Sequence, residues 1–389
     1  MWTTNYNLAK FVPNHYPIVT TMLISDILFQ LELLAPLAWQ ESYDNAGLIT
    51  GKKSWNCTGI ICSLDATEEV IAEAIEKNCN LVVAHHPILF RGVKKLSGDS
   101  YPERAIIKAI KHDIAIYAIH TNLDNYQFGV NYWMAEKLGL KTQSLQVLQP
   151  RPGTLQYLIT YVPAAQSAML REALYAAGAG AIGQYAECSF NTEGRGSFRP
   201  LENAHPAIGT AGGPLEWVEE TRIEVVVPAH LAGKIMAALH QAHPYETPAY
   251  QLISLQNELP QTGAGVIGEL SGSITETDFL QRIKTAFGLQ IIRHTPFINR
   301  PIRTIAMCGG AGSFLTGAAI AAGADAFITA DVKYHEFFDA DGRLLLADIG
   351  HYESEQYTVH GLATYLKAKF PTFAVLHSAV QTNPVRYFA

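Results

Sequence analysis

The sequence predicts an α/β protein whose core is divided into two halves by an inserted α+β domain. Residues 23–150 and 265–389 alternate between short apolar runs and helical apolar stripes, a pattern typical of mainly parallel sheets covered by helices. The segment between them has a different rhythm. Histidines and carboxylates follow apolar runs in both outer segments. We therefore expect the two halves to pack as one domain around a shared site, with the middle segment looped out.

Seven elements are expected in the N-terminal half. Apolar residues recur at helical spacing from Ile24 to Leu37 and predict the first helix. The run Leu-Val-Val-Ala at 81–84 is apolar on both faces, as in a fully buried parallel strand. The complete order is helix 24–37, strand 58–62, helix 67–77, strand 81–84, helix 103–111, strand 114–119 and helix 131–138.

The middle segment is expected to be a ferredoxin-like insert, because its order is βαβ–βαβ with an extra strand. A Gly/Pro-rich stretch at 200–214 interrupts it. The expected elements are strand 154–162, helix 164–177, strand 182–189, a short strand 196–199, strand 216–227, helix 229–242 and strand 249–254.

The C-terminal half again alternates between short apolar runs and helical apolar stripes, as the N-terminal half does. Its expected elements are strand 266–270, helix 276–286, strand 290–293, strand 303–307, helix 313–322, strand 325–329, strand 344–348, helix 353–368 and strand 372–376. The predicted boundaries are an extension over 1–21, expected to be disordered, the N-terminal half over 22–147, the insert over 148–262 and the C-terminal half over 263–389.

Composition favours a self-associating protein. Hydrophobic residues make up 48% of the chain and charged residues only 16%, below the usual ~25%. A chain so poor in charge is expected to bury a large core and also surface between subunits. The net charge of −7 and the absence of a basic run exclude sequence-independent nucleic-acid binding as an expected function.

The sequence also favours a cytoplasmic location. The five cysteines are scattered and form no C-x-x-C pair, which is typical of a reducing compartment. No apolar run reaches the ~20 residues needed to span a bilayer, so no membrane association is expected. Residues 1–21 lack the basic region and apolar core of a secretory signal.

Metal-type ligands follow apolar runs at three places. Together they supply four imidazoles and two carboxylates, a set that could hold two divalent metal ions with shared carboxylates. Ions that accept such ligands are Zn, Fe, Mn, Co and Ni, and the sequence does not choose among them. The residues are His85, His86, His120, Asp124, His351 and Glu355.

Spacing supports this grouping. Neighbouring residues of a strand point to opposite faces, but Pro87 indicates that the strand has ended at His85 and His86, so both could face a metal pair. His351 and Glu355 are four residues apart at the start of a predicted helix and could bind one ion from one helical face. All three segments lie at carboxyl ends of strands, where open α/β sheets bind ligands.

Five segments of the chain resemble the NIF3-like family of dinuclear-metal proteins, many of which are described as GTP cyclohydrolase 1 type 2 homologs. The resemblance runs in order from about Met22 to the C-terminus, and the family's usual Trp is replaced here by Tyr43. The segments are Glu41–Leu48, Ser63–Thr67, His85–Phe90, His120–Asp124 and Gly350–Glu355, with further matches at Gly309–Ser313 and Asp331–His335.

The resemblance implies that the six residues named above carry two metal ions per subunit, with Asp124 and Glu355 as the bridging ligands. It implies a homohexamer and offers GTP, or another nucleotide or phosphoester, as the substrate. The insert resembles the PII/CutA-like domain of some family members, on the pattern of Tyr185, Cys188, Phe190 and the segment His243–Glu246.

Four further features have two readings each. Asp65 could orient a metal-binding imidazole or cap the helix that begins near Thr67. Glu41, Asp44 and Asn45 could line the site or support a turn. The glycines of 309–313 could bind a phosphate at a helix start or only allow a tight turn. His335 could be a general acid–base near the metals or a surface histidine.

The preferred function is a dinuclear metal-dependent hydrolase, with His335 as the candidate catalytic residue. The alternative is a non-enzymatic protein that binds or delivers metal, or regulates through a ligand-sensing insert. A general acid–base beside the metals would favour the enzyme. A site in which protein ligands fill every coordination position of the metals would favour the non-enzymatic metal-binding protein.

Overall fold

The computed structural model describes residues 22–388 and divides them into two compact units. The predicted extension 1–21 lies outside the described residues. The first unit contains the described residues up to Leu34, Gly47–Ile119 and Leu362–Thr382, and the second contains Ala35–Ala46, His120–Gly361 and the residues from Asn383 onward. Among residues 22–388, no helix combines the length and the apolar composition required to cross a membrane.

A five-stranded sheet forms the centre of the first unit, in the order β1-β4-β3-β2-β15. Strands β2, β3, β4 and β15 are parallel, and β1 is an antiparallel edge strand. The inner strands are buried throughout, as their continuous apolar runs predict. The bounds are α1 Ile24–Leu34, β1 Gly47–Thr50, β2 Ile60–Ser63, α2 Glu68–Glu76, β3 Leu81–Ala84, α3 Tyr101–Lys111, β4 Ala115–Ala118 and β15 Val375–His377.

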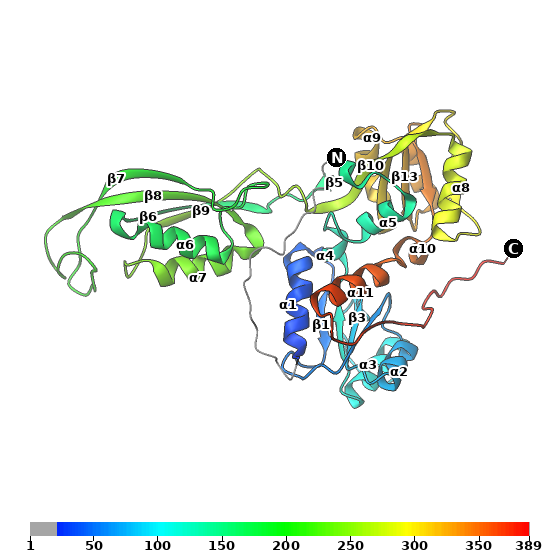
Figure 1. Cartoon of the computed structure of the whole chain (residues 1–389), viewed down its shortest axis with the longest axis horizontal. Helices are drawn as coiled ribbons and strands as arrows, with labels where there is room; N and C mark the ends of the chain where they lie inside the picture. The colour runs from blue at the N-terminus through cyan, green and yellow to red at the C-terminus, as the bar shows by residue number, and fades with distance from the viewer. Residues whose placement is uncertain (1–21, 389) are drawn as a thin grey trace. The chain divides into compact units, whose positions relative to one another are not determined.

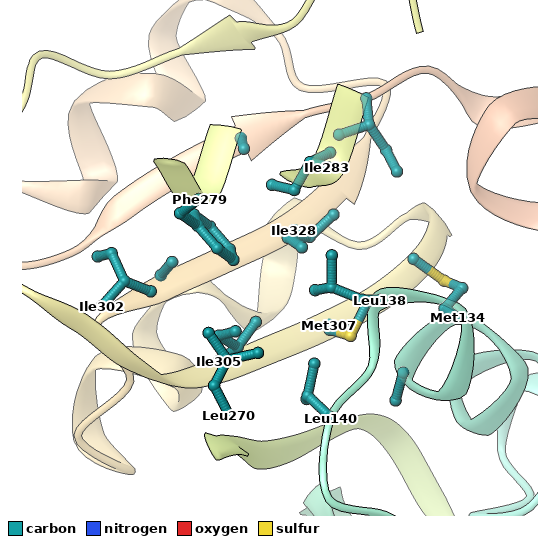
Figure 2. Close-up of a cluster of buried hydrophobic side chains, with 14 of the residues drawn as sticks. Met134, Leu138, Leu140, Leu270, Phe279, Ile283, Ile302, Ile305, Met307 and Ile328 are labelled. Carbon is teal, nitrogen blue, oxygen red and sulfur yellow. The ribbon is translucent and has the colours of Figure 1, made fainter. Parts of the chain in front are cut away.

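A six-stranded sheet in the order β11-β14-β13-β12-β10-β5 lies in the second unit. Strands β12, β13 and β14 are parallel, and α5 and α8 bury one face of them. Figure 2 shows Phe279 and Ile283 of α8 close to Ile328 of β13 and Met307 of β12. The bounds are α4 Thr121–Asp124, α5 Val130–Leu138, β5 Gln146–Pro150, β10 Gly263–Ile274, α8 Glu276–Phe287, β11 Arg293–His294, β12 Ile302–Ala311, α9 Thr316–Ala321, β13 Ala326–Ala330, β14 Leu345–Asp348, α10 His351–Glu355 and α11 Thr358–Lys369.

The middle segment forms a four-stranded antiparallel sheet in the order β7-β8-β6-β9, also within the second unit. Both helices, α6 and α7, lie on one face of it and bury a core of their own (Figure 1). The chain order β-α-β-β-α-β is ferredoxin-like. The bounds are β6 Leu155–Pro163, α6 Ser167–Ala177, β7 Phe190–Phe198, β8 Glu216–Pro228, α7 Ala232–Ala242 and β9 Tyr250–Ser254.

Two predictions about this segment are wrong. The expected strand 182–189 does not form, because Gly183 and Glu187 both have positive φ and the chain turns between Ile182 and Tyr185. The expected short strand at 196–199 is the end of β7, so the sheet has no extra strand. The PII/CutA-like relationship is a finer statement than this connectivity and stays a prediction.

Smaller differences occur at element ends. The first helix ends at Leu34 instead of residue 37, and the helix expected over 353–368 is two helices, α10 and α11. The edge strands β1 and β5 were not predicted. Because β5 pairs with β10 from Gln146 to Pro150, the first residues of the predicted insert 148–262 lie in the six-stranded sheet. The domain boundaries stay predictions.

Candidate metal centre

His85 and His86 directly follow the buried strand β3 in the first unit. Their backbone N–H groups donate to the carbonyls of Ser63 and Leu64, so the parallel pairing with β2 continues to the end of the run. The two rings are 5.0 Å apart between centroids. Their ligand nitrogens lie within 4.8 Å of one another. The strand end therefore presents two imidazoles together, as the sequence predicts.

Each of these two rings has its Nδ1 bonded to an oxygen. His85 Nδ1 lies 2.8 Å from the Ile119 carbonyl, and His86 Nδ1 lies 2.8 Å from Asp65 Oδ1. Burial opposes ionisation of Asp65, but hydrogen bonds from His86 and Thr382 hold its pKa below the usual value. An Nδ1–H that donates to oxygen leaves Nε2 with the lone pair that a metal needs.

Asp65 orients an imidazole, so its reading as a helix cap is wrong. The N-cap of α2 is Thr67, whose hydroxyl accepts a hydrogen bond from the backbone N–H of Val70. Asp65 follows β2 just as His85 follows β3, and the two strands are parallel neighbours. The sequence pattern slightly favoured the helix cap, and the position of Asp65 at the same sheet edge is the signal that would have corrected it.

His120 belongs to the second unit and precedes the short helix α4. Its Nδ1 lies 2.8 Å from Oδ1 of Asp44, whose side chain is shielded from solvent. Burial opposes ionisation of Asp44, yet the hydrogen bonds from His120 and Thr121 lower its pKa to about 2. Asp44 therefore supports a candidate ligand. Glu41 instead accepts hydrogen bonds from Asn125 and Arg151, so its role is to hold the loop before β1 in place.

His351 and Glu355 form the pair expected from their spacing, because both lie on one face of α10. His351 Nε2 lies 3.1 Å from Glu355 Oε2, and His351 Nδ1 lies 2.7 Å from Asp331 Oδ2. Burial lowers the pKa of His351, but Asp331 and Glu355 together raise it to about 11. His351 Nε2 and Glu355 Oε2 therefore lie next to each other in a place where a positive charge is favoured.

Asp331 directly follows β13 and has a φ of +53°. Few non-glycine residues adopt this left-handed conformation, although Asp is among those that tolerate it best. Sequence reasoning did not identify Asp331 as a partner of His351. The rule that ligands follow the ends of strands, which identified the histidines, would also have singled out Asp331, because Asp331 directly follows β13.

Asp124 lies at the end of α4, and its oxygens and those of Glu355 include ligand atoms within 4.8 Å of one another. Asn131 Nδ2 donates to the Asp124 carbonyl, and Asn131 Oδ1 accepts from the backbone N–H of Gly309. The thiol of Cys308 lies close to both carboxylates. Burial, followed by the charges of Asp124 and Glu355, raises its pKa.

The glycine loop 309–313 is explained by packing rather than by anion binding. The backbone N–H groups of Gly309, Gly310 and Gly312 donate to Asn131, Ser354 and Thr329. Gly310 has a φ of +62°, and a Cβ there would lie 2.4 Å from Glu355 Oε1. Its lack of a side chain therefore makes room for the buried Glu355 carboxylate. The tight-packing reading of this loop is favoured.

His335 lies on an exposed 3-10 helix, Tyr334–Ala340, that follows Asp331. Its ring contacts Tyr334 edge-on, with centroids 5.1 Å apart. The residue that bonds His351 Nδ1 is Asp331, not His335. A catalytic role for His335 stays a prediction.

Comparison with known proteins identifies the family. A family model described as Duf34/NIF3 (NGG1p interacting factor 3) matches residues 22–384. The chain belongs to this family. It is 41% identical over 350 residues to a protein of Halalkalibacterium halodurans named "GTP cyclohydrolase 1 type 2 homolog", covering 88% of this chain and 93% of that protein. A Staphylococcus aureus protein of the same name is 36% identical over 374 residues, covering 94% of this chain and all of that one.

A solved structure agrees with the fold of this Duf34/NIF3 member. A Bacillus cereus protein related to NIF3 superposes with a TM-score of 0.81 at 34% identity, covering 95% of this chain and 100% of that chain. The described residues include groups of His, Asp and Glu side chains that could hold metal ions.

Proposed function

We propose that this protein binds two divalent metal ions per chain and uses them for hydrolysis. The ligands are His85, His86, His120, Asp124, His351 and Glu355, with Asp124 and Glu355 bridging the two ions. One observation carries the proposal. All four histidines have Nδ1 bonded to an oxygen, from three carboxylates and one backbone carbonyl. This is the usual support of metal-binding imidazoles, because it fixes the ring and directs Nε2 to the ion.

One distance in the second unit fits a proposed ion. Imidazole and carboxylate ligands lie about 2.0–2.2 Å from an ion such as Zn²⁺, which puts neighbouring ligand atoms roughly 3 Å apart. His351 Nε2 and Glu355 Oε2 are 3.1 Å apart. A mixed imidazole and carboxylate set accepts Zn, Fe, Mn, Co or Ni, so the metal is a question for experiment.

The chemistry follows from the ligand set. Two divalent ions there would lower the pKa of a bound water and polarise a carbon or phosphorus centre of the substrate. Asp44, Asp65 and Asp331 keep the imidazoles in the ligating tautomer. We assign His335 as the general acid–base, because it is exposed and lies four residues beyond Asp331. The name shared by the curated relatives makes GTP the first substrate to test, followed by phosphoesters.

Elemental analysis of purified protein tests the metal assignment. We expect about two divalent metal ions per chain. Asp124→Ala and Glu355→Ala should each lose both ions, because a bridging carboxylate holds the pair together. Asp339→Ala, which removes an exposed carboxylate, is the matched control and should keep both. Retention of two ions by either bridging variant would contradict the bridge.

A hydrolysis assay then distinguishes a metal-dependent hydrolase from a non-enzymatic metal-binding protein. With both metals bound, turnover of GTP or a phosphoester that is lost on chelation supports the hydrolase. His335→Ala should then lower kcat at unchanged metal content if His335 transfers a proton. Full metal occupancy without turnover of either substrate class would favour the non-enzymatic alternative of metal binding, metal delivery or regulation through a ligand-sensing insert.

A further inference from the structure

Asp348 is a buried carboxylate at the end of strand β14, three residues before the candidate ligand His351. The residue is only 5% exposed. Burial of a charged group is costly unless hydrogen bonds replace the water that it loses. Asp348 is not one of the candidate ligands, so its function must lie in the groups that it bonds.

Both oxygens of Asp348 accept hydrogen bonds. Oδ2 accepts from the backbone N–H of Val332 at 3.1 Å and from Arg293 Nη1 at 2.9 Å. Oδ1 accepts from the backbone N–H of Gly350 at 3.1 Å. One carboxylate therefore connects the chain that follows β13, the N-cap of α10 and the edge strand β11.

The two backbone groups that Asp348 bonds adjoin the two members of one hydrogen-bonded pair. Val332 directly follows Asp331. Gly350 directly precedes His351, whose Nδ1 lies 2.7 Å from Asp331 Oδ2. Asp331 and Gly350 have φ of +53° and +88°. A non-glycine residue keeps such a left-handed conformation only where the surrounding structure holds it. The hydrogen bonds of Asp348 supply that support on both sides of the pair.

Arg293 compensates the buried charge of Asp348. The two residues are directly opposite each other in the antiparallel pairing of β11 and β14. Arg293 Nη2 also donates to the Val332 carbonyl at 2.9 Å, and its guanidinium lies 5.0 Å from the centroid of the Phe337 ring. Val332 is therefore held at its N–H and at its carbonyl, and the buried carboxylate has a charged partner.

We propose that Asp348 is a positioning residue of the metal centre. It sets the imidazole–carboxylate distance from His351 Nδ1 to Asp331 Oδ2, and thereby the direction of His351 Nε2. A metal-binding imidazole depends on the group that holds its other nitrogen. The effect of Asp348 on metal binding rests on the proposed function, whereas its effect on the imidazole–carboxylate distance does not.

Asp348→Asn tests this role, because an amide side chain has a single accepting oxygen. That oxygen can serve the N–H before His351 or the N–H after Asp331, but not both. In a crystal structure of the metal-free variant, the imidazole–carboxylate distance should rise from 2.7 Å to beyond about 3.5 Å. Calorimetric titration of the apo-protein with Zn²⁺ should show roughly ten-fold weaker binding.

Asp325→Asn is the matched control. Asp325 directly precedes β13, at the end of that strand opposite to Asp331, and its Oδ2 accepts from the backbone N–H groups of Arg303 and Thr304 at 2.9 and 2.8 Å. Its replacement should lower the urea midpoint of unfolding, as Asp348→Asn should, but leave the imidazole–carboxylate distance and the Zn²⁺ affinity unchanged. Equal changes of distance or affinity in the two variants would overturn the proposal.

Arg293→Met keeps the test decisive if Asp348→Asn does not fold. The Arg293 side chain is 56% exposed, so its replacement leaves the core intact while it removes the bonds to Asp348 and to the Val332 carbonyl. The imidazole–carboxylate distance should lengthen and Zn²⁺ binding should weaken. Arg293→Lys, which keeps the positive charge beside Asp348, should restore part of both.

The outcomes separate this role from the proposed function. A wild-type protein that binds no metal would contradict the proposed function, and the imidazole–carboxylate distances of the variants would still decide the role of Asp348. An unchanged distance in Asp348→Asn, or in Arg293→Met where Asp348→Asn does not fold, would overturn the positioning role. If the wild type binds Zn²⁺, a lengthened distance with unchanged Zn²⁺ affinity would overturn it as well.

Discussion

At the scale of single residues, the main feature of the candidate metal centre is the hydrogen bonding that holds its imidazole rings. Three carboxylates, Asp44, Asp65 and Asp331, each bond the Nδ1 of one candidate ligand. In a site where each imidazole must offer Nε2, the partner at Nδ1 decides the tautomer and the direction of the ring. Residues that touch no metal are thus expected to control metal affinity.

Replacement of these carboxylates should weaken metal binding without unfolding the protein. We expect Asp44→Asn and Asp65→Asn each to lower metal affinity about 10–100-fold, because an amide can also donate and no longer fixes the tautomer. Calorimetric titration of the apo-protein with Zn²⁺ measures the effect, and Asp339→Asn is the control. Unchanged affinity in both variants would mean that the imidazoles do not depend on these partners.

Gly310 gives a second prediction at the residue scale. Its positive φ and its closeness to Glu355 mean that Gly310→Ala should cost at least about 1–2 kcal/mol of unfolding free energy and reduce metal content. Gly317 is the matched control, since it lies in helix α9 with open space around a Cβ. Gly317→Ala should raise stability by up to about 1 kcal/mol. Urea unfolding and elemental analysis measure both; equal stability of the two variants would contradict the packing argument.

At the scale of elements, the chain leaves the six-stranded sheet after β5, forms the four-stranded sheet, and returns to the six-stranded sheet at β10. Strands β5 and β10 are antiparallel neighbours on either side of it in the chain, and Arg151 N donates to the Thr262 carbonyl at 3.0 Å. The two ends that flank the middle segment therefore lie next to each other. This geometry would allow the predicted insertion between β5 and β10 without a change in their pairing.

Removal of the insert should leave a folded core. We expect a chain with residues 153–259 replaced by a short Gly/Ser linker to stay folded and to keep its metal content, because the ends it joins are already hydrogen-bonded. Arg151 and Thr262 are retained, since Arg151 bonds Glu41 and Thr262 is buried. Circular dichroism and elemental analysis measure the outcome. A metal-free or unfolded product would show that the core depends on the insert.

At the scale of the whole molecule, the low charge content points to self-association. Large apolar side chains such as Phe29 and Leu33 on α1 are 58% and 60% exposed. Closed symmetric assembly is the usual way to bury such surface without forming fibres. We propose a homo-oligomer, and the family resemblance makes a hexamer the expected size.

Light scattering behind a sizing column measures the assembly. We expect a mass near six times 42.6 kDa at micromolar protein concentration. A monomeric mass would refute self-association, whereas a dimer or trimer would refute only the hexamer. Repeating the measurement on the chain without residues 153–259 tells whether the core alone assembles.

The sequence by itself predicted most elements of both outer segments and named the candidate ligands, although the strand expected over 290–293 is only β11, Arg293–His294. Buried parallel strands such as 81–84 are short apolar runs, helices are apolar stripes, and ligands follow strand ends, so each signal is local in the chain. The same local rules failed at 182–189, where residues with positive φ interrupt the run. They also missed the edge strands β1 and β5, which are only partly buried.

Only the tertiary structure decided which carboxylate supports which imidazole. Asp44 and His120 are 76 residues apart, and Asp331 and His351 are 20 apart, so no spacing along the chain links them. It also decided that the 309–313 loop packs against Glu355, because that depends on what lies opposite each glycine. The physical reason is the same in both cases. Hydrogen bonding and packing depend on distance in space, which the sequence encodes only through the complete fold.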